Sequence, residues 1–107
     1  MATLYVGNDM RLALQGRGRL EDENGNPVTG ATVEATLYSL DQSTEVGGVT
    51  WPVALTEGSE DGEYFGILPA EAEVEAGKDY FLNIDVVAPG DAKAKWMQKV
   101  RAAYRRM

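Results

Sequence analysis

Residues that favour turns recur about every 10–20 positions along this chain, and their spacing is the feature that most restricts its fold. These turns are rich in Gly, Asn, Asp and Pro and lie at residues 7–9, 24–27, 47–48, 58–62, 77–79 and 89–91. The segments between them are short, and most of them alternate apolar with polar residues. Such alternation is typical of half-buried strands, so we predict an all-β protein.

The alternation is clear in five segments, at residues 10–14, 31–38, 49–55, 63–68 and 80–87. The residues predicted to face inward in the second and last of these are Ala31, Val33, Ala35, Leu37, Tyr80, Leu82, Ile84 and Val86. Pro52 has no backbone N–H to donate, so segment 49–55 is expected to lie at a sheet edge or to contain a bulge.

Two further segments are ambiguous. Residues 69–77 contain good helix formers but also alternate small apolar residues with glutamate, so we interpret them as a helical turn or an extended crossover. The C-terminal segment 93–106 would place Trp96, Val100 and Tyr104 in one stripe if it were a helix. As a strand it would bury the same three residues together with Ala102, with Gln98 as a polar exception. The short turn at 89–91 favours the strand, because it suits a hairpin.

About seven short strands without a βαβ pattern predict a single antiparallel β-sandwich that spans residues 1–107. Trp51 and Trp96 are predicted to fill its core. The chain contains no cysteine, so no disulfide bond can support this core.

The composition excludes several kinds of chemistry. Without histidine or cysteine, the chain cannot form zinc, haem or iron–sulfur sites from these residues, nor a catalytic triad with a histidine base. Asp22, Asn24 and Asn26 match the start of a calcium-binding loop, but Pro27 and Val33 stand where that loop needs glycine and glutamate. We therefore interpret this segment as a hairpin turn and residues 60–63 as a solvated loop, and we expect no enzyme activity, metal or cofactor.

Charge is divided unevenly along the chain. The first 92 residues contain all 17 acidic residues and four of the ten basic ones, a net charge of −13, whereas the last 15 residues carry +6. The basic residues of this last segment are Lys93, Lys95, Lys99, Arg101, Arg105 and Arg106. One interpretation is a solvated strand face that also protects a sheet edge from stray pairing. The other is a docking surface for an acidic partner, including a second copy of the chain. Nucleic acid is the least favoured partner, because the acidic remainder repels phosphate.

Residues 24–33 resemble the turn and strand pattern G-x-P-V-x-G-A-x-V of transthyretin-like and immunoglobulin-like sandwiches. Over nearly the whole chain, the order of turns and core segments resembles the small sandwich proteins encoded among bacteriophage and prophage structural genes. The segments that carry this second resemblance are residues 6–9, 24–25, 30–33, 50–52, 62–69, 76–80 and the closing basic strand.

The resemblance implies an immunoglobulin-like fold and a structural role in a phage virion, as a capsid decoration protein or as a head–tail or tail accessory. The implied partners are capsid or tail proteins, or further copies of the chain, and the implied location is the virion after synthesis in the host cytoplasm. No signal peptide or membrane-spanning run is found in the sequence. We expect the six basic residues of the last segment and Tyr104 to form the docking surface. The alternatives are a transthyretin-like module that recognises carbohydrate or protein through its loops, and a cytoplasmic regulatory or chaperone-like factor.

Overall fold

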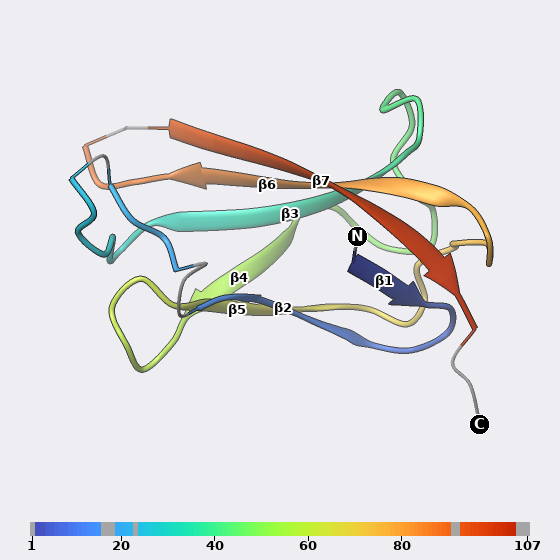
Figure 1. The fold of residues 1–107 in the computed structure, drawn as a ribbon, viewed down its shortest axis with the longest axis horizontal. Coiled ribbons are helices and arrows are strands. Elements are labelled where there is room, and N and C mark those ends of the chain that lie inside the picture. Colours follow the sequence, from blue (N-terminus) through green and yellow to red (C-terminus); the bar gives the residue numbers. More distant parts are fainter. Residues whose placement is uncertain (1, 16–18, 23, 91–92, 105–107) are drawn as a thin grey trace.

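The computed structural model describes residues 2–15, 19–22, 24–90 and 93–104 (Figure 1). These residues form seven strands and no helix. The strands are β1 (Ala2–Tyr5), β2 (Met10–Leu14), β3 (Thr32–Ser39), β4 (Val53–Glu57), β5 (Tyr64–Leu68), β6 (Asp79–Val87) and β7 (Lys93–Ala103). The prediction of an all-β domain with about seven strands is confirmed. The C-terminal segment is a strand, so its helical alternative is wrong.

The strands form one hydrogen-bonded series in the order β1-β7-β6-β3-β4-β5-β2. This series is folded into two layers, with β3, β6 and β7 in one layer and β2 and β5 in the other (Figure 1). The strand β4 joins the layers, because its first part pairs with β3 and its last part pairs with β5. The fold is therefore closer to an open barrel than to two separate sheets. One strand pair, β1 with β7, is parallel, which the expected antiparallel arrangement did not include.

The core lies between the two layers and consists of the inward-facing residues of the alternating strands. Val33, Ala35 and Leu37 of β3 are almost completely buried, and Tyr80, Leu82, Ile84 and Val86 of β6 pack beside them as predicted. Leu12 of β2 and Leu68 of β5 contribute from the opposite layer. Burial of such side chains is the main favourable contribution to the stability of a domain without disulfide bonds.

Two tyrosines attach loops to this core. The hydroxyl of Tyr64 donates to the Val28 carbonyl at 2.9 Å and accepts the Ala31 N–H at 3.2 Å, so β5 holds the segment that precedes β3. Gly30 has a positive φ of 71°, which allows the sharp bend into β3. The hydroxyl of Tyr80 accepts the Glu75 N–H at 2.8 Å and anchors the crossover between β5 and β6.

Two of the expected segments differ from the structure. The strand β4 begins at Val53, after a cis peptide bond between Trp51 and Pro52, so residues 49–52 are not part of it. Trp51 still packs against the core and donates its indole N–H to the Val46 carbonyl. Residues 69–77 form an irregular crossover without a helix, with turns near both ends, and Ala72 and Val74 pack against the core from it.

Candidate functional site

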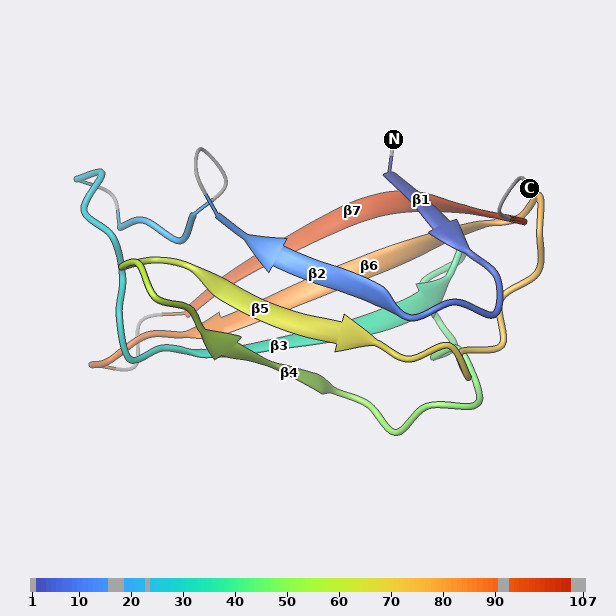
Figure 2. The ribbon, with the colours of Figure 1, turned by 90° about the horizontal axis from the view of Figure 1, so that it is seen from below.

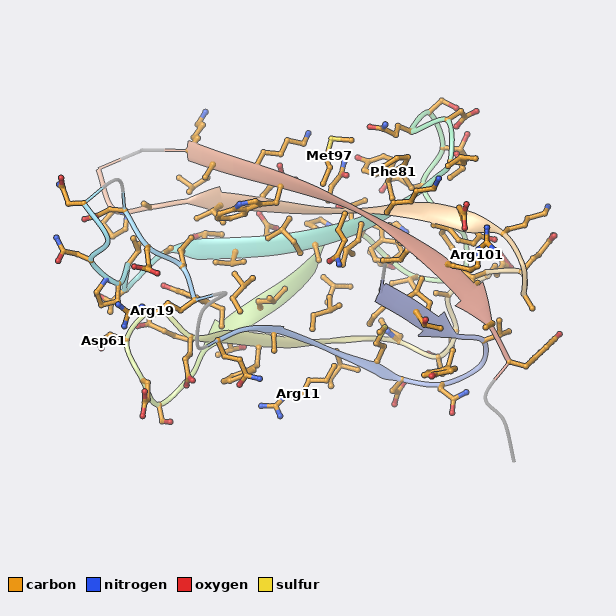
Figure 3. All side chains as sticks on the ribbon, viewed as in Figure 1. Arg11, Arg19, Asp61, Phe81, Met97 and Arg101 are labelled. Carbon is orange, nitrogen blue, oxygen red and sulfur yellow. The ribbon has the colours of Figure 1, made fainter. Side chains whose placement is uncertain are left out.

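The strand β7 carries most of the residues predicted to bind a partner. Lys93, Lys95, Lys99 and Arg101 are all exposed and lie at alternate positions on the side of β7 that faces away from the core. We call this side of β6 and β7 the basic face. Its members are Lys93, Lys95, Met97, Lys99 and Arg101 of β7 and Asp79, Phe81, Asn83, Asp85 and Val87 of β6. Met97 and Phe81 point away from the β2–β5 layer in Figure 3.

Of the other three predicted site residues, only Tyr104 is described by the structure, and it is not part of this face. Tyr104 lies just beyond the end of β7 and is 73% exposed, so its predicted inward position is wrong. Tyr104 follows Ala103, which is the last residue of β7 that pairs with β1. Arg105 and Arg106 lie outside the described residues.

Carboxylates of β6 neutralise part of the positive charge on the basic face. The Arg101 guanidinium donates to both carboxylate oxygens of Asp79, at 2.8 and 3.3 Å, and the Lys99 ammonium lies 3.5 Å from the same carboxylate. The Lys95 ammonium is 3.9 Å from Asp85. The hydrogen bond from Arg101 is the main cause that lowers the pKa of Asp79, and the same bond raises the pKa of Arg101. Three of the four cationic side chains thus form ion pairs with the two carboxylates of β6, and the face keeps a positive excess.

Apolar and amide groups lie between these charges. Met97 is 47% exposed and Val87 is 38% exposed, whereas Asn83, directly opposite Met97 in the strand pairing, is buried. Within the described part of the chain, the side-chain oxygen of Asn83 is a buried acceptor without a hydrogen-bond partner. A buried acceptor without a hydrogen-bond partner lowers the stability of the fold, so packing alone does not explain why asparagine occupies position 83.

The sequence did not reveal the β6 side of this face. These β6 residues could have been found by pairing the two alternating segments on either side of the turn at 89–91. This pairing places Asp79 opposite Arg101 and Asp85 opposite Lys95. The inward position of Tyr80, Leu82, Ile84 and Val86 had already assigned the residues between them to the outer side.

The prediction that Trp96 fills the core is wrong. Trp96 does point to the inner side of its layer, since it pairs with the buried Ile84, but it is 46% exposed. The reason is that the two layers are not closed at this position, because β1 pairs only with residues Val100–Ala103 of β7.

The acidic loops serve as turns. One carboxylate oxygen of Asp22 accepts the N–H groups of Asn24 and Asn26 at 2.9 and 3.0 Å, as expected for a hairpin turn rather than a calcium loop. Asp41 accepts the Ser39 hydroxyl and the Ser43 N–H, and these bonds lower its pKa to about 2. Across the described residues, no cluster of three or more acidic side chains is arranged to hold a metal ion.

The comparisons with known proteins supply no relative. No protein-family model, curated protein or solved structure matches the chain. A search of the described residues also finds no helix that is long and apolar enough to cross a membrane.

Proposed function

We propose that this protein is a non-enzymatic structural component of a bacteriophage particle and that it docks on an acidic protein surface of the capsid or tail. The observation that supports the docking role is the basic face, on which four cationic side chains of one strand lie exposed on the same side. The virion role rests on the resemblance of residues 6–9, 24–25, 30–33, 50–52, 62–69, 76–80 and the closing basic strand to phage structural proteins.

The composition of the basic face suits a protein partner. Met97 and Val87 offer exposed apolar area at its centre and end, and the cationic side chains surround them. Protein interfaces commonly combine an apolar centre with a charged rim that steers association. An acidic partner would also neutralise the positive charge of this face that Asp79 and Asp85 leave uncompensated.

The ion pairs already present on this face decide which substitutions can test the proposal. Arg101 donates two hydrogen bonds to Asp79, so its reversal to glutamate would place two carboxylates together and disturb β6 and β7. Lys93 and Lys95 lie at the start of β7, and among the described residues their one ion pair is the long contact of 3.9 Å from Lys95 to Asp85. Because one exposed charge contributes only about 0–1 kcal/mol, both lysines have to be changed together.

The test compares particles made with the wild-type chain, with Lys93→Glu/Lys95→Glu and with the control Arg11→Glu/Arg19→Glu. The control changes the net charge equally, with Arg11 on β2 in the opposite layer and Arg19 next to the loop at 20–22, where it forms an ion pair with Glu21 (Figure 3). We expect mass spectrometry of purified particles to find the wild-type and control chains and to find the β7 variant depleted by about tenfold or more.

Two results would overturn parts of the proposal. Particles that lack the wild-type chain would exclude a virion role. Equal incorporation of both double variants would exclude the basic face as the docking surface. Circular dichroism and urea unfolding of the purified variants establish that each one folds before its incorporation is compared.

A further inference from the structure

The first part of β7 has an open edge. β6 pairs with Lys93–Arg101 of β7, but β1 pairs only with Val100–Ala103, so within the described part of the chain residues 93–99 have a neighbouring strand on one side only. Figure 2 shows β1 beside the final part of β7 and not along its beginning. An exposed strand edge offers unpaired N–H and C=O groups to another extended chain.

The hydrogen-bond pattern identifies the backbone groups at this edge. Ala102 donates to the Lys78 carbonyl and accepts the Gly77 N–H, so its backbone groups face β6, whereas the Ala103 carbonyl accepts the Val6 N–H on the other side. The pairing of β6 with β7 continues without a bulge to Val87 and Lys93. Antiparallel pairing alternates regularly along a strand. The backbone groups of Lys93, Lys95, Met97 and Lys99 therefore face the open edge.

The two sides of this edge differ in chemistry. The outer side carries the ammonium groups of Lys93, Lys95 and Lys99. The inner side carries Ala94, Trp96 and Gln98, and it borders two hollows of about 440 and 210 Å³. The larger one is lined mainly by Leu20, Val28, Val86, Ala88 and Ala94, together with Glu21, Asp22 and Lys93, and the smaller one by residues that include Leu12, Leu14, Ile84 and Gln98.

We propose that the open edge of β7 binds an extended acidic segment of another protein as an added strand. Its carboxylates, at alternate positions, would lie beside Lys93, Lys95 and Lys99. The apolar residues between them would enter the inner side next to Trp96. Backbone hydrogen bonds would supply affinity, and this alternation would supply specificity. The inference rests on the proposed function, because it uses the same strand for docking.

A second copy of this chain fits the edge less well. If two β7 strands paired with each other in antiparallel fashion, every register that overlaps residues 93–99 would place a lysine opposite another cationic residue. The two strands that end the hydrogen-bonded series, β1 and β2, contain no acidic residue, and β2 adds Arg11. Glutamates do alternate with apolar residues at 71–75, but Ala72 and Val74 pack against the core of their own copy and the Glu73 N–H bonds to the Gly47 carbonyl, so this segment is already engaged. The occupant that we infer from the charges is therefore a different polypeptide.

The test uses the full chain and two synthetic peptides, one in which glutamate alternates with valine and one in which the same sequence is N-methylated at alternate backbone nitrogens. The methyl groups are on the glutamate nitrogens, which face β7 when the glutamates lie opposite the lysines, so the methylated peptide carries the same charge but cannot pair with β7 in this register. We expect the first peptide to slow hydrogen exchange at the amides of Lys95, Met97 and Lys99 by about tenfold or more. The amides of Ala94, Trp96 and Gln98 already bond to β6 and should change little. The Lys93→Glu/Lys95→Glu variant should lose the effect, and Arg11→Glu/Arg19→Glu should keep it.

Each other outcome has a defined meaning. Equal binding of both peptides, with changes limited to lysine side chains, would overturn strand addition but would leave docking by the basic face intact. If neither peptide binds but particle incorporation still depends on Lys93 and Lys95, strand addition is likewise overturned and docking by the basic face remains. If the same three amides were protected in the free protein in proportion to its concentration, a second copy would be the occupant and the proposal would be wrong.

Discussion

The two parts of β7 differ more from each other than their sequences suggest. Residues 93–99 are exposed on both sides of the strand, whereas Val100 and Ala102 are almost completely buried. Both parts alternate, and both pair with β6 without interruption. The difference is that β1 pairs with the second part and extends the layer over it, while the first part forms the edge of the layer. Burial along this strand therefore depends on which neighbour is present, and not on the pattern of the strand itself.

The comparison also separates two roles. The second part of β7 is structural, since it joins β1 to the core and fixes the crossover through hydrogen bonds between Gly77, Lys78 and Ala102. The first part contributes little to the core, because its side chains are exposed on both sides. It is therefore free to present its lysines and its backbone to a partner. Three measurements of stability test this difference between residues 93–99 and residues 100–103 of β7.

The substitution Leu4→Ala removes the main side chain by which β1 covers the second part of β7. Leu4 is buried and pairs with Ala102, so its loss leaves a cavity beside the core. We expect the free energy of unfolding in urea to fall by about 2–5 kcal/mol. Thr3→Ala, on the other side of the same strand, is the control and should cost much less. A loss no larger for Leu4→Ala than for the control would show that β1 is not what buries Val100 and Ala102.

Two alanines on the inner side of β7 allow a direct comparison of its parts. Ala102 is completely buried, whereas Ala94 is exposed beside the larger hollow. Ala102→Leu should overpack the core and lower the free energy of unfolding by about 1–3 kcal/mol. Ala94→Leu should change it by no more than about 0.5 kcal/mol. Equal losses in thermal or urea unfolding would mean that the first part of β7 is packed as tightly as the second.

The smallest effect concerns the ion pair that holds the second part of β7 to β6. The hydrogen bond from Arg101 lowers the pKa of Asp79 below its ordinary value of 3.8. Its stabilising contribution is present above the pKa of the unfolded chain and is lost as the pH falls through the lower folded-state pKa. We expect the melting temperature of the wild type to exceed that of Asp79→Asn near neutral pH, with a difference that shrinks as the pH is lowered through the acidic range below about 4. A difference that stays constant over this range would exclude the ion pair as its cause.

Much of the fold was predictable because strand alternation has a period of two and needs only local sequence. The inward faces of β2, β3 and β6 followed from Leu12, Val33 and Leu82 and their alternate neighbours, and all three are buried. The start of β4 was not predictable, because Trp51 and Pro52 continue the alternation although the strand begins only at Val53. The parallel pairing of β1 with β7 joins residues almost a whole chain length apart, and no local pattern indicates such a pair.

For the candidate site, the amino-acid sequence alone showed a basic segment of alternating character at residues 93–106. It also placed Lys93, Lys95, Lys99 and Arg101 on one side of a strand, because alternate side chains of a strand must point the same way. The folded structure was needed to show that Asp79 and Asp85 lie on β6 beside these cations, that Trp96 is half exposed, and that residues 93–99 keep an open edge. These properties depend on strand pairing and on the length of β1, which bring together residues that are distant in the sequence.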